Sequence, residues 1–341
     1  MISKKLTIKD IARLAGVSTA TVSRVLNNKP YISKEIKEKV MFIIKQTGYR
    51  PNLNAKSLAS QQTFTIGVIV PNIANPYFAE ITQWLEFFAD KNDYDIILVD
   101  TRNNPQKEKR IFDMFRQKRV DGIIIASLLK KESEIVIYEF LKNKYPIVLI
   151  DRHFESIITD YVVNDNELGG YMATKHLIEL GHKKITFLCR SLEEYAVKLR
   201  YKGYLKALQE YNLPIKEEYL IESNIPLIEG GIKGAEIFAN LKSNPTAIFA
   251  ANDYMAIGAM KYLKEKCYKI PQDVSIVGFD NIELSQYIEP PLTTVTQNKM
   301  EMCKIAFEIL LRKIENPEKD FEQVVIPPKL IERKTTTKLK N

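Results

Sequence analysis

The chain has 341 residues, of which 45% are hydrophobic and 27% charged, a composition typical of a folded protein of about two to three domains. Its net charge of +8 is concentrated near the start: residues 1–60 contain 12 Lys and Arg against three Asp and Glu, whereas the rest of the chain sums to −1. The three cysteines are scattered and show no CxxC spacing, which argues against a disulfide framework. An apolar leader is not seen, and no stretch approaches the ~20 apolar residues of a membrane span, which argues against a secreted protein and a membrane protein. A cytoplasmic location is therefore expected.

Residues 7–15 have the pattern of an amphipathic helix. The apolar residues at the i, i+3, i+4 and i+7 positions of one helix face are Ile8, Ile11, Ala12 and Ala15. Thr7, with Asp10 three residues later, predicts a capping box. The segment is therefore predicted to form a helix that begins after Thr7.

Two further helices are predicted after Gly16, which tolerates the backbone of a tight turn. Ser18 is suited to cap the second helix, and Ser33 the third. The apolar residues are Val22, Val25 and Leu26 in the second helix and Ile36, Val40, Ile43 and Ile44 in the third. Two short helices joined by a glycine-containing turn and braced by a third are typical of a helix-turn-helix unit.

The second helix would present its early outward residues to the major groove of DNA. Arg24 can pair with two acceptors on guanine, and Ala20 offers a methyl group to a base edge. Ser18, Thr21 and Asn27 suit phosphate contacts, which position the unit without reading sequence. The candidate DNA contacts here are Thr7, Ser18, Thr19, Ala20, Thr21, Ser23, Arg24 and Asn27. The local basic charge favours double-stranded DNA as a partner over the alternative of a structural three-helix bundle.

The run TIKDIARLAGVSTATVSRVLNN, followed by GYRPNLNAKSLAS, resembles the DNA-binding head of the LacI/GalR repressor family. The resemblance implies that Thr19, Ala20 and Arg24 determine which operator is read. It also implies a hinge helix after Pro51, in which Leu58 wedges into the minor groove at the operator centre. The residues flanking this leucine are Asn52, Ala55 and Lys56. A helix this short is unstable by itself, and we therefore expect it to fold when it binds DNA. The alternative to the minor-groove wedge is that Leu58 makes only a simple linker contact.

From residue 63 onward, strand and helix signals alternate. The predicted strands lie in FTIGVIV, DIILVD, VDGIIIA, PIVLID, KITFLC, TAIFAAN and VSIVGFD, and most are separated by helical stretches. This order predicts parallel sheets covered by helices on both faces. The units separate near Tyr161–Asn166, which indicates two similar lobes with a ligand between them at the carboxyl ends of the strands.

This region resembles the type I periplasmic-binding-protein core of the same family. The expected fold is α/β: a two-lobed, doubly wound parallel-sheet core preceded by a small all-α helix-turn-helix domain. The expected parts are a head at residues 1–50, a hinge at 51–62 and a core at 63–341. The N-lobe would comprise residues 63–163 and 293–322, and the C-lobe 164–292 and 323–341. The chain would cross between lobes near Val163–Asp165, Pro291–Thr294 and Phe321–Val325.

The resemblance also implies which residues contact a small effector. They are Asn75, Tyr77, Phe78, Asp151, Arg152, Arg200, Asn252, Asp253, Asp280 and Gln297. Aromatic faces together with charged and amide groups suit a polyhydroxylated ring, so a sugar or sugar derivative is favoured, with a purine as the alternative. Asp253 could instead serve only as a helix cap, and Asp165 could only hold a crossover turn. Arg190-Ser191 stands where many relatives have a Gly-Pro loop, which could bring Glu193, Glu194 or Tyr195 to the cleft.

The chain ends in VVIPPKLIERKTTTKLKN without the leucine-heptad tail that makes some family members tetramers, so a homodimer on a pseudo-palindromic operator is expected. A co-regulator protein is a further possible partner. No metal cluster, cofactor motif or catalytic motif such as GxSxG or HExxH is present, and no cofactor is expected. The chain is therefore predicted to be a transcription regulator, most simply a repressor, rather than an enzyme or a transport protein with the same core. An effector that changes the angle between the lobes would change DNA affinity.

Overall fold

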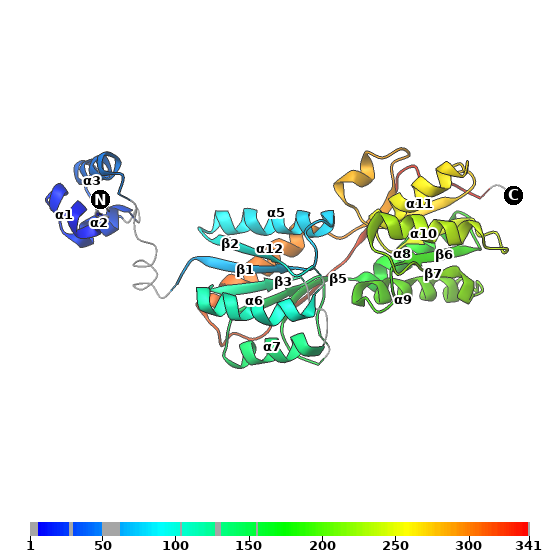
Figure 1. Cartoon of the computed structure of the whole chain (residues 1–341), viewed down its shortest axis with the longest axis horizontal. Coiled ribbons are helices and arrows are strands. Elements are labelled where there is room, and N and C mark those ends of the chain that lie inside the picture. Colours follow the sequence, from blue (N-terminus) through cyan, green and yellow to red (C-terminus); the bar gives the residue numbers. More distant parts are fainter. Residues whose placement is uncertain are drawn as a thin grey trace. The chain divides into compact units, whose positions relative to one another are not determined.

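A computed structural model of the chain describes residues 6–26, 30–49, 62–102, 104–126, 131–154 and 156–339, apart from the side chains of residues 105, 106, 108, 109 and 131–133. The chain divides into two compact units, Met1–Phe64 and Thr65–Asn341 (Figure 1). The predictions made for Asn27, Asn52, Ala55, Lys56 and Leu58 lie outside the described residues.

The described residues of the first unit form three helices, α1 (Ile8–Ala15), α2 (Thr19–Leu26) and α3 (Lys34–Thr47), as the apolar spacing predicts. They share one small core, whose buried members are Ile11, Ala12, Ala15, Val22, Val25 and Val40. The predicted capping box is present at the start of α1: the Asp10 amide donates to Thr7 Oγ1, and the Thr7 amide donates to Asp10 Oδ2. Gly16 ends α1 with a left-handed φ of 65°, which a residue without a side chain adopts without strain.

The second unit contains two six-stranded sheets. The first has the order β11-β5-β4-β3-β1-β2 and the second β12-β10-β9-β8-β6-β7. Strands of the first sheet are β1 (Thr65–Val70), β2 (Asp95–Asp100), β3 (Gly122–Ile125), β4 (Ile147–Ile150), β5 (Asp160–Asn164) and β11 (Gln323–Ile326). Strands of the second sheet are β6 (Ile185–Cys189), β7 (Leu220–Glu222), β8 (Ala247–Ala250), β9 (Ser275–Asp280), β10 (Thr293–Thr296) and β12 (Lys329–Ile331). All neighbours run parallel except β10 and β12, which are antiparallel.

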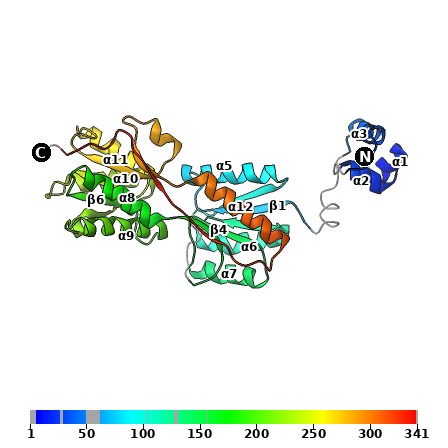
Figure 2. The same ribbon diagram turned by 180° about the vertical axis from the view of Figure 1, so that it is seen from behind.

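Helices cover both faces of each sheet (Figures 1 and 2). Around the first sheet lie α5 (Pro76–Lys91) and α12 (Lys299–Glu315) on one face and α6 (Pro105–Lys118) and α7 (Lys131–Lys142) on the other. Around the second lie α8 (Asn166–Glu179) and α9 (Tyr195–Glu210) on one face and α10 (Leu227–Ala239) and α11 (Asp253–Glu265) on the other. The described residues of the second unit also form two short 3-10 turns, η1 (Glu217–Tyr219) and η2 (Glu283–Gln286). We call the first sheet with its helices the N-lobe and the second the C-lobe.

The strands are apolar on both faces because each sheet is buried on both sides. In β1, Ile66 and Val68 face the cluster under α5 and α12, while Ile69 faces the cluster under α6 and α7. In β9, Ile276 packs toward α10 and α11, whereas Val277 and Phe279 pack toward α8 and α9. The predicted α/β fold with two parallel-sheet lobes is confirmed.

Two of the three expected crossings between the lobes need correction. Residues 293–296 form β10, which pairs with β9 and so belongs to the C-lobe, and the chain crosses only after it. Residues 323–326 form β11, which pairs with β5 and belongs to the N-lobe. The expected crossings near Pro291–Thr294 and Phe321–Val325 are therefore too early by a few residues, since each of these strands completes a sheet before the chain leaves it.

Among the described residues, no helix combines the length and the apolar character that crossing a membrane requires.

Candidate DNA-reading helix and candidate effector site

The second helix of the first unit turns one face inward and leaves the other accessible. Val22 and Val25 are buried in the core, whereas Thr19, Ala20 and Arg24 are exposed. Among the other predicted DNA contacts, Thr7 and Ser18 are exposed and Thr21 and Ser23 are half-buried. The side chains predicted to reach base edges therefore lie on the accessible face of α2.

Ser18 holds the start of this helix. Its Oγ accepts a hydrogen bond from the Thr21 amide at 3.0 Å and lies 2.9 Å from Thr21 Oγ1. The cap satisfies an amide that the first helical turn leaves without an internal partner. The two hydroxyl groups expected to contact phosphates thus lie together at the end of the helix whose dipole favours anions.

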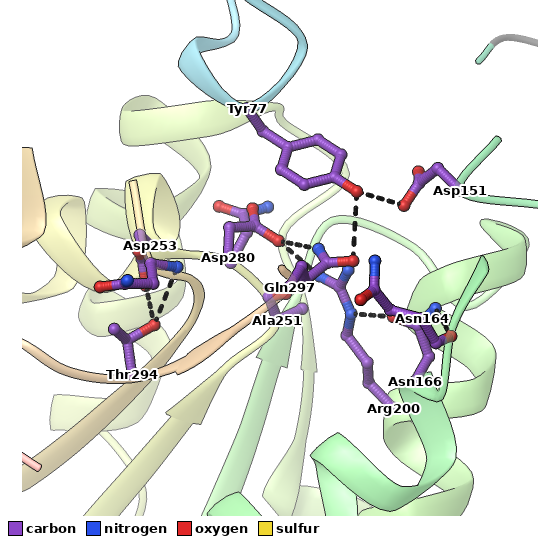
Figure 3. A network of polar contacts seen from close by, with 12 residues as sticks. Tyr77, Asp151, Asn164, Asn166, Arg200, Ala251, Asp253, Asp280, Thr294 and Gln297 are labelled. Carbon is purple, nitrogen blue, oxygen red and sulfur yellow. Dashed lines mark hydrogen bonds and ion pairs between the residues drawn. The ribbon is translucent and has the colours of Figure 1, made fainter. Parts of the chain in front are cut away.

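In the second unit, residues from both lobes form one polar cluster at the carboxyl ends of the strands (Figure 3). Tyr77 on α5 and Asp151 after β4 come from the N-lobe, and Asp280 at the end of β9 comes from the C-lobe. Gln297 lies in the crossing after β10. The Tyr77 hydroxyl donates to Asp151 Oδ1 at 2.6 Å, and its oxygen lies 3.2 Å from Gln297 Oε1. Gln297 Nε2 in turn donates to Asp280 Oδ1 at 2.5 Å.

Arg200 on α9 completes the C-lobe side of this cluster and is only 5% exposed. Its Nε donates to Asn166 Oδ1 at 2.8 Å, and its Nη1 donates to the Ala251 carbonyl at 2.5 Å. The same Nη1 lies 3.4 Å from Asp280 Oδ1, and the guanidinium stacks 3.8 Å from the centroid of the Phe279 ring. The guanidinium is therefore held at a defined angle by an amide, a carbonyl, a carboxylate and an aromatic face.

Burial shifts the acids of the cluster toward their protonated forms. It raises the pKa of Asp280 to about 6, against the opposing effects of Arg200 and Lys299. It also raises the pKa of Asp151, which the hydrogen bond from Tyr77 and the charge of Arg200 lower. The pKa of Tyr77 is raised well above its ordinary value by burial and by Asp151. With a pKa of about 6, Asp280 accepts hydrogen bonds as a carboxylate at neutral pH and can donate one once it is protonated in mildly acidic solution, which suits a hydroxylated ligand.

Several other predicted effector contacts are engaged elsewhere. Asn75 and Asn252 cap α5 and α11, since their Oδ1 atoms accept the amides of Tyr77 at 3.1 Å and Met255 at 2.9 Å. Phe78 packs edge-on against Tyr77, with centroids 5.1 Å apart. The structure therefore brings five of the ten predicted residues into one network: Tyr77, Asp151, Arg200, Asp280 and Gln297.

Asp253 is not the helix cap that was the alternative to effector contact, because Asn252 caps α11. The side chain is fully buried, and its carboxylate accepts hydrogen bonds from the Ile282 amide at 2.9 Å and from Thr294 Oγ1 at 2.5 Å. Burial and the charge of Asp280 raise its pKa to about 8. Asp253 thus joins α11, β10 and the segment after β9. Asp165, in contrast, does cap a helix, α8, by accepting the Leu168 amide at 2.8 Å.

The segment after Arg190-Ser191, where the sequence departs from the family pattern, contacts the N-lobe through Tyr195. Its hydroxyl lies 3.0 Å from His153 Nδ1, and the His153 ring stacks on Tyr161 at 4.4 Å. Arg152, another predicted contact, lies 5.9 Å from the centroid of the Tyr195 ring. Glu194 instead pairs with Arg190 at 3.3 Å, and Glu193 is exposed.

Sequence reasoning missed Asn164, Asn166 and Lys299, which are buried beside the cluster. Asn164 and Asn166 flank the end of β5, a strand that was not among the predicted ones. A search for polar residues directly after every β-branched run, including DYVVN, finds both. Lys299 follows the crossing residue Gln297 by two positions and carries no comparable signal.

The pH dependence of stability tests the burial of Asp253. In the unfolded chain the Asp253 carboxyl has its ordinary pKa of 3.8, whereas in the folded protein its pKa is about 8. Between these pH values the unfolded state releases the proton more readily, so the free energy of unfolding falls as the pH rises. Asp253→Asn keeps both hydrogen bonds, because its amide can donate to Thr294 Oγ1 and accept from the Ile282 amide. Between pH 5 and pH 8 we expect the variant to lose roughly 1–3 kcal/mol less unfolding free energy than the wild type. Urea unfolding at both pH values measures this, and parallel pH profiles would contradict it.

A helix-turn-helix unit followed by a two-lobed core with polar residues gathered between the lobes defines a DNA-binding regulator. Two family models match the chain: bacterial regulatory proteins of the lacI family at residues 7–52, and the periplasmic binding protein-like domain at residues 174–336. The chain is 37% identical to the ribose operon repressor of Haemophilus influenzae, over 98% of this chain and 99% of that protein. It is 38% identical to the HTH-type transcriptional repressor PurR of Mannheimia succiniciproducens, with the same coverage.

Solved structures agree with these matches. The Lac repressor dimer bound to operator and the anti-inducer ONPF is similar with a TM-score of 0.86 and 29% identity, over 98% of this chain and all of that one. A LacI family transcriptional regulator of Enterococcus faecium with bound ribose is similar with a TM-score of 0.72 and 31% identity, over 81% of this chain and all of that one. The chain therefore belongs to the LacI family and is a DNA-binding transcription regulator.

Proposed function

We propose that this protein is a repressor that binds a pseudo-palindromic operator as a homodimer and is controlled by a sugar-like effector held between its lobes. The observation that carries the proposal is the interlobe cluster, in which Arg200, Asp280 and Tyr77 place a cation, an acid and an aromatic hydroxyl side by side. The hydroxyl groups of a small polyhydroxylated ring can form hydrogen bonds to these side chains in place of the bonds that the side chains make with one another, so that no buried polar group is left without a partner.

Ribose is the first ligand to test, because two similar regulators are described with ribose bound and one relative is named for the ribose operon. A purine is the second candidate, because several relatives are named PurR. Calorimetric titration of the full-length protein with ribose, ribose 5-phosphate, hypoxanthine and guanine separates the two classes. Binding of a purine alone would replace the sugar proposal, and binding of none would overturn both.

Self-association is supported by apolar side chains on the outer surface of both lobes. On α5, Trp84, Phe87 and Phe88 form two edge-to-face ring pairs, and Phe87 remains 41% exposed. In the C-lobe, Leu284 and Tyr287 near η2 are 43% and 70% exposed. Exposed aromatic residues at such positions are typical of protein interfaces. Sedimentation equilibrium of the full-length chain is expected to give the mass of two chains.

Operator binding is expected to depend steeply on salt, because the basic charge lies in the first 60 residues. Each phosphate neutralised adds about −0.9 to the slope of log affinity against log salt concentration. If each subunit contacts about three phosphates, affinity falls by roughly three orders of magnitude between 50 and 200 mM salt. Fluorescence anisotropy with labelled operator measures the slope, and a slope near zero would contradict a phosphate-dominated interface.

A further inference from the structure

The strand that supplies Asp280 ends in a backbone conformation that needs outside support. Asp280 and the next residue, Asn281, have φ values of 108° and 47°. Residues with a side chain rarely adopt positive φ, and two in succession persist only where surrounding contacts hold them. The direction in which the Asp280 carboxylate points therefore depends on what holds this turn.

The backbone carbonyls of the turn are held from the opposite lobe. Lys299, the first residue of α12, is 8% exposed, and its Nζ donates to the backbone carbonyls of Asp280 and Asn281, both at 3.0 Å. Glu80 on α5 neutralises this ammonium group, with Oε2 2.8 Å from Nζ. The other carboxylate oxygen of Glu80 accepts the amide of Glu283 at 3.1 Å. One ion pair of the N-lobe thus binds three backbone groups of the C-lobe.

The remaining supports of the turn belong to the C-lobe itself. Arg333 Nη2 donates to Asn281 Oδ1 at 2.7 Å, and Arg333 Nη1 donates to the Leu292 carbonyl at 2.7 Å. The Ile282 amide donates to Asp253. These bonds form within the C-lobe and do not depend on where the N-lobe lies. None of these three bonds involves the Asp280 carbonyl, to which Lys299 donates.

We propose that Lys299, paired with Glu80, is a positioning residue that holds the Asp280–Asn281 turn from the opposite lobe and so couples lobe closure to the orientation of Asp280. In this arrangement the Asp280 carboxylate lies 3.4 Å from Arg200 of its own lobe and accepts a hydrogen bond from Gln297 in the crossing. Ile282, the apolar residue directly after the turn, also ties the turn to the N-lobe. It is 2% exposed and packs in the N-lobe cluster that contains Met302. The effector part of this inference rests on the proposed function, whereas the coupling of the lobes does not.

Amide hydrogen exchange of the full-length, ligand-free protein tests the coupling directly. In Lys299→Met, the peptide covering residues 280–288 is expected to exchange at least tenfold faster than in the wild type, because the turn loses its support. Lys299→Arg keeps the charge and the donors and is expected to restore most of the protection. Lys304→Met removes an exposed lysine from the same helix and serves as the control. Glu80→Gln tests the other half of the pair without removing Lys299 and is expected to raise exchange of the same peptide.

Titration with ribose tests the positioning role. We expect Lys299→Met to weaken ribose binding at least tenfold, Lys304→Met to leave it unchanged, and Lys299→Arg to recover it to within about threefold. Unchanged exchange of residues 280–288 in both Lys299→Met and Glu80→Gln would overturn the coupling. Faster exchange with unchanged ribose affinity would overturn the positioning of Asp280. If the wild type itself does not bind ribose, the sugar proposal fails, and the exchange result alone decides the role of Lys299.

Discussion

Replacement of Arg200 by alanine is expected to abolish effector binding and to destabilise the core. The guanidinium is buried with Asp280, the Ala251 carbonyl and Asn166, so its removal takes the paired cation from a buried carboxylate and a hydrogen-bond donor from two further acceptors. Breaking a buried ion pair from one side costs roughly 3–5 kcal/mol. Thermal unfolding without ligand measures this loss, and calorimetric titration with ribose measures the loss of binding.

A double variant separates the two effects. Arg200→Met with Asp280→Asn removes both charges, fills the space of the arginine stem and leaves no unpaired ion. We expect this variant to regain most of the lost stability yet to remain unable to bind the effector, because the polar groups that recognise it are gone. The coupling free energy between the two positions should be several tenths to about 3 kcal/mol. Effector affinity equal to that of the wild type in the double variant would place the effector site elsewhere.

Replacement of Arg24 by alanine is expected to give the largest loss in operator binding. Arg24 lies on the exposed face of α2, and a bidentate contact to guanine contributes about 1–3 kcal/mol of base discrimination. Because a dimer on a pseudo-palindromic operator uses the residue twice, the loss should be roughly 2–6 kcal/mol for the whole site. Anisotropy titrations with operator and with random DNA of equal length measure the loss and its dependence on sequence.

Arg13→Ala is the matched control, because it removes the same charge from the same unit. Arg13 lies on α1, and its Nη2 pairs with Asp10 Oδ1 at 3.1 Å, with 79% of its side chain exposed. It is expected to weaken operator and random DNA alike, and by much less. An equal loss on both DNAs for Arg24→Ala would show that Arg24 contacts phosphate and does not read a base.

The sequence predicted best those features that depend on neighbours along the chain. The capping box of Thr7 and Asp10 and the helix of residues 8–15 follow from contacts within four residues, and both are present. The seven predicted strands are β-branched runs apolar on both faces, and each is found within a sheet. The small strand β10 was not predicted, because its sequence TTVT is polar and becomes a buried strand only beside β9 and β12.

The sequence by itself determined the class of the protein, since the helix-turn-helix pattern, the local basic charge and the alternation of strands and helices are all readable along the chain. Tertiary structure alone decided which of the polar residues after the strands work together. Asn75, Asn252 and Asp253 are polar residues that follow strands, as Asp151 does, yet the two asparagines cap helices and Asp253 holds the buried amide of Ile282. Asn75 and Asn252 accept amides only two and three residues further along the chain, whereas Asp151, Asp253 and Asp280 accept hydrogen bonds from residues 17 or more positions away. Only folding brings such distant donors within about 3 Å of a carboxylate. Lys299 and Asp280 become partners in this way only where the two lobes meet.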